Sequence, residues 1–355
     1  MSSPGTVLVT GGAGFIGVAL ARKLAADAAR WVVLDNLHPQ VHAEGKRPRE
    51  LTESAELVIG DVTDADAWDH LLRELRPDVV VHLAAETGTA QSLHEATRHA
   101  QVNVVGTTAM LDAFARAGHV PAHFVLSSSR AVYGEGQWER DGVRFSPGQR
   151  SHAQLAAGEW DFAGARPLPS AAAVTPPAPT SIYGATKLGQ EHLLRVWCAS
   201  HDSTLTTLRL QNVYGPGQSL INSYTGIVSL FSQLAKSGEA IPVYEDGGIT
   251  RDFVFIEDVA DAFVEIITDP PSGVDRVFDI GSGVGTTVLE LARRIADFHG
   301  APAPRITGAF RDGDVRHCEC SIAATLDGIQ WRPRWSVAEG VGALQRWIDE
   351  QVVGA

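Results

Sequence analysis

The chain has 355 residues, of which 44% are hydrophobic and 20% are charged, and its formal net charge is −13. These values are typical of a soluble globular protein with one large domain or two modest ones, and the acidic balance argues against nucleic acid or an anionic membrane as a partner. Three cysteines (Cys198, Cys318 and Cys320) form no disulfide framework, which fits a reducing compartment. With no evident signal peptide and no apolar run of about 18 residues, the protein is expected in the cytoplasm.

Short apolar runs alternate with helix-like segments through residue 216. The runs favour strands buried on both faces, because they are continuous and rich in β-branched residues. Strands are predicted at 6–10, 31–35, 55–62, 78–85, 123–129 and 204–210, and helices at 18–29, 64–75, 91–117 and 184–199. This alternation indicates βαβ units, so the sequence predicts an α/β fold with a doubly wound parallel sheet.

The pattern changes after about residue 217, where a smaller α/β domain is predicted. We assign 217–249 and 283–355 to this domain and expect the segment of about 250–282 to return toward the main sheet. Helices are expected at 225–238 and 286–300, a strand and helix at 251–267, and short strands in "WRPRW" (331–335) ahead of an amphipathic end.

Residues 136–180 stand apart because they contain two tryptophans, many glycines and prolines, and no clear period. A connection of this length is uncommon unless it is a functional loop or is disordered. The tryptophans favour partial order. Two interpretations stay open: a flap over the site, or a surface excursion unrelated to the chemistry.

Gly11, Gly14 and Gly17 form G-x-x-G-x-x-G between the first strand and the first helix. Glycines let the backbone turn tightly and approach a pyrophosphate, which then lies at the helix N-terminus where N–H groups favour anions. Asp35 ends the next predicted strand. A carboxylate there accepts hydrogen bonds from an adenosine ribose diol and repels a 2′-phosphate, so NAD is favoured over NADP.

Three later segments follow in the order in which a bound dinucleotide would meet them. Asp61 and Val62 come after the third strand and are candidates to meet the adenine. "HLAA" (82–85) would pass along the cofactor, and Asn103 lies on the following helix. Each segment alone is more often plain structure than a ligand contact, so only their order supports the assignment.

Tyr183 lies four residues before Lys187 in a predicted helix, so both side chains share one face. An ammonium near a phenol favours the phenolate and is expected to lower the pKa of Tyr183, which would then take a proton from an alcohol as its carbon loses hydride. "SSSRAVYG" (127–134) ends a parallel strand, at the edge where such sheets bind ligands. Ser129 is the candidate to hydrogen-bond the reacting oxygen.

These motifs together resemble the extended short-chain dehydrogenase/reductases that act on nucleotide sugars; the matching segments are TGGAGFIG, Asp35, HLAA, SSSRAVYG, Tyr183-x-x-x-Lys187 and RLQNVYGPG. The resemblance covers nearly the whole chain. It implies a Rossmann domain over 1–216 that binds NAD and a C-terminal domain that holds a nucleoside diphosphate sugar. It also implies that Tyr183 is the base, that Lys187 binds the nicotinamide ribose and tunes Tyr183, and that Ser129 orients the sugar hydroxyl.

The same resemblance supplies two sets of expected contacts. The residues expected to contact NAD are Gly11, Gly14, Phe15, Ile16, Gly17, Asp35, Asn36, Asp61, Val62, Leu83, Ala84, Ala85, Asn103, Ser127, Tyr183, Lys187, Gln211 and Val213. The residues expected to contact the sugar nucleotide are Glu86, Thr87, Ser129, Arg130, Tyr183, Asn212, Tyr224, Thr225, Arg251, Arg311 and Asp314. Guanidinium groups suit a diphosphate because they offer fixed positive charge in a fork.

Members of the resembled family include epimerases, 4,6-dehydratases, decarboxylases and ketoreductases. The dehydratases carry an Asp-Glu pair directly after the Ser/Thr, and decarboxylases usually a glutamate, where this chain has Arg130 and Ala131. Net reductases often prefer NADPH, against Asp35. The sequence therefore favours an NAD-dependent 4-epimerase, with the other three activities and a non-catalytic nucleotide-sensing protein as alternatives.

Among epimerases, the motifs look most like the dTDP-L-rhamnose 4-epimerase type, whose insert usually carries paired cysteines that are missing here. Arg130 is expected either to meet a carboxylate of the substrate or to pair with Glu86 or Glu135. His317, Cys318 and Cys320 lack the usual spacing of a zinc site, so no metal is predicted. The resemblance also implies a homodimer formed through the helix that carries Tyr183 and the 91–117 helix.

Overall fold

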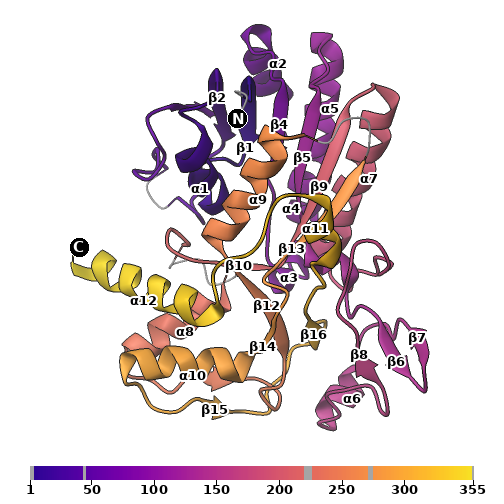
Figure 1. The fold of residues 1–355 in the computed structure, drawn as a ribbon, viewed down its shortest axis with the longest axis vertical. Coiled ribbons are helices and arrows are strands. Elements are labelled where there is room, and N and C mark those ends of the chain that lie inside the picture. Colours follow the sequence, from indigo (N-terminus) through magenta and orange to yellow (C-terminus); the bar gives the residue numbers. More distant parts are fainter. Residues whose placement is uncertain (1–3, 43–44, 220–225, 271–274, 354–355) are drawn as a thin grey trace.

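Seven parallel strands form the centre of the protein, in a computed structural model that describes residues 4–42, 45–219, 226–270 and 275–353. Their order is β13-β9-β5-β4-β1-β2-β3 (Figure 1). The strands are β1 (Thr6–Thr10), β2 (Arg30–Asp35), β3 (Ala55–Ile59), β4 (Val79–His82), β5 (His123–Ser129), β9 (Thr204–Leu210) and β13 (Arg276–Ile280). The prediction of a doubly wound Rossmann sheet is confirmed. Two strands end earlier than predicted, because residues 60–62 and 83–85 leave the sheet at its carboxyl edge.

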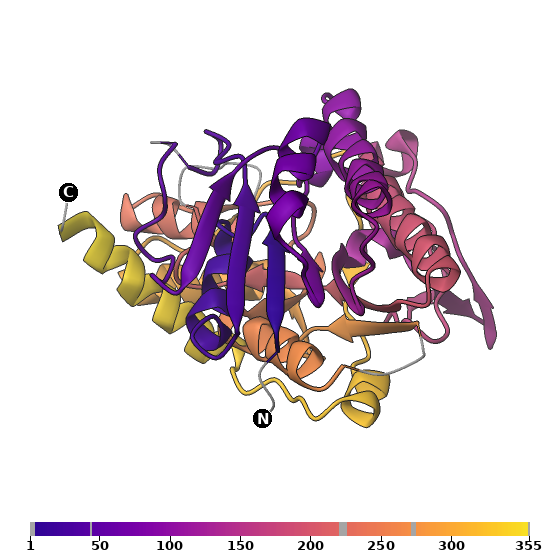
Figure 2. The ribbon, with the colours of Figure 1, turned by 90° about the horizontal axis from the view of Figure 1, so that it is seen from above.

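Helices cover both faces of this sheet, which explains why its strands are apolar on both sides (Figure 2). One face carries α2 (Ala65–Glu74), α5 (Gly106–Ala117) and α7 (Ile182–Ser200), which share a buried cluster with the strands. The opposite face carries α1 (Phe15–Leu24) and α9 (Ile256–Thr268), which pack against each other and against a second cluster.

The helix predicted over 91–117 is interrupted. It consists of α3 (Thr89–Ser92), α4 (Ala96–Ala100), a π-helical turn (Gln101–Val105) and α5. The hydroxyl of Ser92 donates to Thr89 O (2.7 Å), and Glu95 leaves the helical region with φ −123° and ψ 44°. The helical ladder therefore ends at residues 92–95 and restarts afterwards.

The C-terminal part contains smaller sheets and helices beside the main sheet. Strand β12 pairs with β10, β14 and β16, not with the main sheet, whereas β13 pairs with β9. The division into two domains at 216 stays a prediction. The remaining elements there are β10 (Asn212–Tyr214), α8 (Ile227–Lys236), β11 (Pro242–Val243), β12 (Thr250–Phe255), β14 (Gly285–Thr287), α10 (Val288–His299), β15 (Arg305–Ile306), β16 (His317–Cys318), α11 (Ala323–Gly328) and α12 (Val337–Val353).

The short strands predicted in residues 331–335 are wrong. Pro333 has no N–H to give to a ladder, and the next two amides bond elsewhere. Arg334 N and Trp335 N donate to the Asp258 carboxylate at 2.9 and 3.1 Å, in the first turn of α9. This segment is therefore an irregular strap held by a carboxylate that lies far away in the sequence.

The insert at 136–180 is ordered. It contains a small antiparallel sheet and a short helix: β6 (Trp138–Arg140), β7 (Val143–Phe145), α6 (His152–Ala156) and β8 (Arg166–Pro167). Trp138 is buried and lies with its ring edge against Phe162, at a centroid distance of 4.9 Å. This packing supports the order that the tryptophans predicted, while the role of the insert as a flap stays a prediction.

Buried charges join the insert to the C-terminal part. Arg150 is 2% exposed; its Nε lies 3.2 Å from Glu135 Oε1, and its Nη2 lies 2.9 Å from Glu245 Oε1. The same Nη2 donates to Asp314 O (2.8 Å). Arg316 continues the network by donating from Nε to Asp161 (3.0 Å). Arg150 of the insert thus binds Glu245 of the C-terminal part, and Arg316 of the C-terminal part binds Asp161 of the insert. These two contacts hold the insert in place.

Among the described residues, no helix is both long and apolar enough to cross a membrane.

Candidate active site

The glycine-rich turn lies between β1 and α1 and is tightly packed. Gly11 has φ +66°, and a Cβ there would lie 2.7 Å from Ala84 N. A Cβ on Gly17 would lie 2.4 Å from Gly12 Cα, so the first turn of α1 approaches the preceding loop too closely for a larger residue. Gly14 is the N-cap of α1 and no side chain caps the helix there. The cradle therefore fits an anion such as a pyrophosphate.

Asp35 lies at the end of β2 and is 9% exposed. Its Oδ2 accepts from Ala13 N at 3.0 Å and its Oδ1 accepts from Leu37 N at 2.9 Å. The carboxylate therefore also stabilises the glycine-rich turn, a role that the sequence did not reveal.

The residues predicted around the adenine largely bond to one another. Asn36 donates to Asp61 (2.8 Å), and Asp61 also accepts from the backbone N–H and the hydroxyl of Thr63. Val62 is buried in the cluster beneath α2 and α5. These groups form a braced edge beside the ends of β2 and β3.

Asn103 lies in the π-helical turn and is fully buried. Its amide accepts from Glu86 N (2.7 Å) and donates to Glu86 O (3.0 Å) and Thr186 Oγ1 (2.9 Å). Asn103 therefore ties the loop after β4 to α7. This arrangement makes it a brace between two parts of the site.

The other predicted cofactor contacts lie around the same edge. Gln211 is buried, and its Nε2 has no hydrogen-bond partner among the described residues. Phe15, Ile16, Val213, Leu83, Ala84 and Ala85 are half-buried, and Ser127 is buried in β5. An orphaned donor such as Gln211 Nε2 is the kind of group that a bound polar ligand would satisfy.

Tyr183 lies in the first turn of α7, where Ser181 caps the helix by accepting from Gly184 N (3.0 Å). Its hydroxyl is hydrogen-bonded to Ser129, the last residue of β5. Burial raises the pKa of Tyr183 above its ordinary value, while the Ser129 hydrogen bond and the charge of Arg130 oppose this rise. The tyrosine and serine predicted for proton transfer are therefore in direct contact.

Arg130 pairs with neither Glu86 nor Glu135. Its Nε donates to Asn212 Oδ1 (2.8 Å) and its Nη1 to Cys318 Sγ (2.8 Å). Glu86 pairs with Arg98 instead (2.8 Å), and Glu135 with Arg150 as described above. Arg130 thus brings a positive charge next to Tyr183, and it is bonded to an amide oxygen and a sulfur atom.

The action of Lys187 on Tyr183 stays a prediction. It is 2% exposed, and its Nζ donates to Gln190 Oε1 (2.8 Å). Burial lowers the pKa of Lys187 to about 7, opposed by the charge of Glu191. Arg130 is a cation whose charge opposes the raised pKa of Tyr183, while the Lys187 ammonium is bonded to Gln190.

Several predicted substrate residues converge next to Arg130. Asn212 receives its hydrogen bond, and the buried Arg251 pairs with Asp314 at 3.1 Å. Burial lowers the pKa of Arg251, and the charge of Arg130 lowers it further, so two guanidinium groups share this region. Arg311 is exposed and lies 5.1 Å from the centre of the Tyr244 ring.

Two further predicted substrate residues stand apart from that group, and two cannot be placed. Glu86 is occupied by Arg98, and Thr87 is exposed beside it. Tyr224 and Thr225 lie outside the described residues.

Sequence reasoning missed the groups that hold Lys187. His82, at the end of β4, is fully buried; its Nδ1 lies 2.7 Å from Thr10 Oγ1 and its Nε2 lies 3.1 Å from Gln190 Nε2. Burial, with the charge of Lys187, lowers the pKa of His82 to about 3. A histidine and a glutamine inside apolar segments give no local signal of this contact, because they meet only after β4 and α7 pack.

Acid is expected to destabilise the protein through His82. Its folded-state pKa lies below the unfolded value, so the unfolded state binds more protons and the free energy of unfolding falls as the pH drops below about 6.5. Between pH 7 and pH 5 this one group contributes a loss of about 2 kcal/mol. Urea unfolding of wild type and His82→Gln at both pH values checks this. Burial also lowers the pKa of His123, to about 4, but His123 is present in both proteins. An equal loss of stability in the two would therefore contradict the role of His82.

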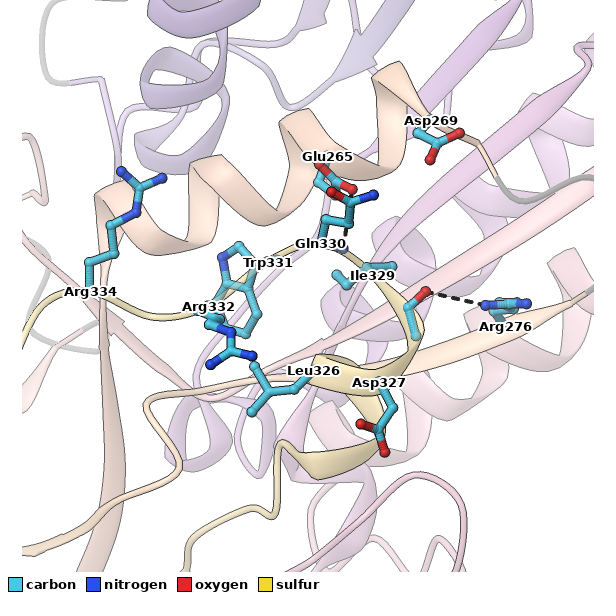
Figure 3. A pocket seen from close by; sticks show the side chains of 11 residues that line it. Glu265, Asp269, Arg276, Leu326, Asp327, Ile329, Gln330, Trp331, Arg332 and Arg334 are labelled. Carbon is cyan, nitrogen blue, oxygen red and sulfur yellow. Dashed lines mark hydrogen bonds between the residues drawn. The ribbon is translucent and has the colours of Figure 1, made fainter.

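A separate pocket lies along α9, away from these residues (Figure 3). It is lined by Glu265 and Asp269 of α9, Arg276 of β13 and residues 326–332 and Arg334. Gln330 N donates to Glu265 Oε1 (3.2 Å) across its wall. None of its lining residues is among those predicted for cofactor, substrate or catalysis.

Comparisons with known proteins agree on one family. A model described as the NAD dependent epimerase/dehydratase family matches residues 7–281. The chain is 58% identical to a dTDP-L-rhamnose 4-epimerase of Burkholderia thailandensis, over 98% of this chain and 95% of the relative. It is 33% identical to a UDP-glucose 4-epimerase of Mycolicibacterium smegmatis, over 94% and 95% respectively.

Solved structures give the same result. A UDP-glucose 4-epimerase of Thermotoga maritima with UDP-glucose superposes with a TM-score of 0.79 at 28% identity, covering 98% of this chain and 99% of the other. The UDP-glucose 4-epimerase of Thermus thermophilus in complex with NAD gives 0.77 at 28% identity, covering 97% and 99%.

Proposed function

The chain belongs to the NAD-dependent epimerase/dehydratase family, and we propose that it is a nucleoside diphosphate sugar 4-epimerase that acts on dTDP-L-rhamnose. The observation that carries this proposal is the 58% identity to a dTDP-L-rhamnose 4-epimerase, which extends over 98% of the chain. The product is the sugar with C4 inverted, a nucleotide-linked 6-deoxy-L-talose of unchanged mass.

Proton transfer at C4 is assigned to Tyr183. Its phenolate takes the proton from the C4 hydroxyl and later returns it to the same oxygen, while the hydrogen bond from Ser129 orients that oxygen. A bound NAD, which the glycine-rich turn and Asp35 would hold, would supply the acceptor and donor of the C4 hydride, so that the reaction would involve no net oxidation. The contact between Tyr183 and Ser129 supports this assignment.

We assign to Arg130 and Arg251 the role of balancing negative charge, on the phenolate of Tyr183 and on the diphosphate of the substrate. A positive charge beside Tyr183 stabilises the phenolate that proton transfer requires. The two guanidinium groups also provide the charge that a diphosphate needs. The lack of a carboxylate partner for Arg130 among the described residues supports this role, because its charge stays available to the substrate.

A homodimer is proposed through α5 and α7. Val105 is 42% exposed in the turn before α5, and Val196 is 67% exposed on α7, which supports a covered apolar face there. Sedimentation of the purified protein tests this. A cytoplasmic location is proposed from the three unpaired cysteines, which suit a reducing compartment.

The test of the proposed function combines cofactor release and sugar analysis. Purified protein is denatured and the released NAD(H) is assayed, and native protein is incubated with dTDP-L-rhamnose and, in parallel, UDP-glucose. We expect near-stoichiometric NAD and, by proton NMR, a C4-inverted product of unchanged mass from dTDP-L-rhamnose. A product lighter by water or carbon dioxide, or turnover that requires added NADPH, would replace the epimerase by one of the alternative activities.

A further inference from the structure

The ammonium of Lys187 is held by one neutral group. Lys187 is buried, and among the described residues its only hydrogen-bond acceptor is Gln190 Oε1, at 2.8 Å and three residues further along α7. The titratable groups that face it are Glu191, which is neutralised by Arg209 at 2.7 Å, the buried His82, and Tyr183 one turn earlier. The place of the ammonium therefore depends on where Gln190 directs its oxygen.

A buried side-chain network sets the direction of the Gln190 amide. Gln190 is fully buried, and its Nε2 donates to Thr107 Oγ1 (2.9 Å) and lies 3.1 Å from His82 Nε2. Thr107 donates its own hydroxyl to Asn103 O (2.6 Å), so its oxygen is left to accept. With the amide nitrogen on this side, the amide oxygen must point toward Lys187.

The tautomer of His82 completes the argument. The ring is neutral, so one nitrogen carries a proton and the other accepts. Nδ1 lies 2.7 Å from Thr10 Oγ1, and Nε2 faces the Gln190 amide nitrogen. Nε2 also lies 3.0 Å from Thr107 Oγ1, so a proton on Nε2 would have an acceptor there, but Nε2 would then no longer accept from the Gln190 amide. Only with the proton on Nδ1 does Nε2 accept from the Gln190 amide, so this is the tautomer that fixes the direction of the amide.

We propose that Gln190 is a positioning residue for Lys187, and that His82 determines which end of the Gln190 amide faces the ammonium. This inference rests on the proposed function only for its kinetic readout. Thr10 is the last residue of β1, directly before Gly11. The network therefore connects the strand that leads into the glycine-rich turn with the lysine on α7, two parts of the chain that would meet the same dinucleotide.

The test uses two changes at Gln190 and a matched control. Gln190→Met keeps the length but removes the acceptor, whereas Gln190→Glu keeps an acceptor for the ammonium. Gln345→Met is the control, because Gln345 is also fully buried and bonds through both amide atoms, to His299 (2.9 Å) and Ser232 (2.9 Å), in the C-terminal part. Thermal unfolding followed by circular dichroism verifies that all three variants fold.

Two readouts are measured for each variant. The first is kcat and KM for dTDP-L-rhamnose, where Gln190→Met should lose about 100-fold in kcat with little change in KM, since a misplaced catalytic group costs about that much. The second is NADH affinity of the cofactor-stripped protein against pH, followed by fluorescence. The transition in this profile should move to higher pH in Gln190→Glu, because the added carboxylate favours the charged lysine.

The outcomes separate the inference from the proposed function. If wild type does not invert dTDP-L-rhamnose, the proposed function fails, yet the NADH profile still tests Gln190. If both Gln190 variants match Gln345→Met in kcat and in the pH profile, Gln190 has only a structural role and the inference is overturned.

Discussion

Replacing Tyr183 by Phe should reduce kcat by about 100- to 10,000-fold, the range that general acid–base groups contribute. The phenyl ring keeps the packing of the first turn of α7, but no group remains to take the C4 proton. NAD content and KM should change little, because the hydroxyl is proposed to act on the reacting oxygen. Steady-state kinetics with dTDP-L-rhamnose and assay of released NAD(H) measure both effects.

Tyr214→Phe is the matched control for this change. Tyr214 is 1% exposed, and within the described part of the chain its hydroxyl makes one long hydrogen bond, to Val337 O at 3.4 Å. This variant should keep its activity. If Tyr183→Phe turned over within a few-fold of it, Tyr183 would not be the base, and a group next to Ser129 would have to replace it.

Arg150→Met should destabilise the protein by roughly 3–5 kcal/mol, the cost of removing one partner from a buried charge pair. Glu135 and Glu245, which are 5% and 1% exposed, would lose their shared guanidinium, and Glu245 would keep its contact with Arg316, at 2.8 Å. Burial already raises the pKa of Glu135, and the charge of Arg150 opposes that rise, so its loss raises this pKa further. Urea unfolding at neutral pH measures the change in the free energy of unfolding.

Arg166→Met provides the comparison within the same insert. Arg166 is 66% exposed in its side chain and pairs with Glu139 at 2.7 Å on the surface. Exposed pairs of this kind contribute less than about 1 kcal/mol. Similar losses in the two variants would mean that the Arg150 network adds no more than a surface contact, and the insert would then be held by its aromatic packing.

The central sheet was predictable because its signal is local. The run at 6–10 is largely apolar and β-branched and forms β1 with the predicted bounds, and the strands predicted at 123–129 and 204–210 likewise match β5 and β9. The strands predicted at 331–335 were wrong for the opposite reason, because the structure there depends on a distant residue. The backbone amides of Arg334 and Trp335 bond to Asp258. The break in the helix at 92–95 was not predicted, because the sequence has good average helix propensity there. Hydrogen bonds from polar side chains to the backbone compete with the helical ones.

Some features of the candidate site were likewise predictable from local sequence, and others were not. The spacing of Tyr183 and Lys187 on one helix placed the two residues correctly, but not the direction of the lysine ammonium, which depends on Gln190 and on a histidine from another strand. Cys318 reaches Arg130 across 188 positions of the chain, and no spacing rule anticipates such a contact. The residues proposed to react were visible in the pattern, whereas most of the residues that contact them became visible only after packing.

Strand β13 forms one edge of the main sheet although it comes late in the sequence. This order affects how the protein folds during synthesis. It pairs with β9 in a register that joins residue 276 to residue 206. The strands β1 to β5 can form their ladders as soon as they leave the ribosome, because domains fold from the N-terminal side first. The edge of β9 stays open until the later segment emerges, and parallel pairing across such separations is slow. The nascent chain therefore passes through a stage with an unpaired edge, when chaperones would be expected to hold it.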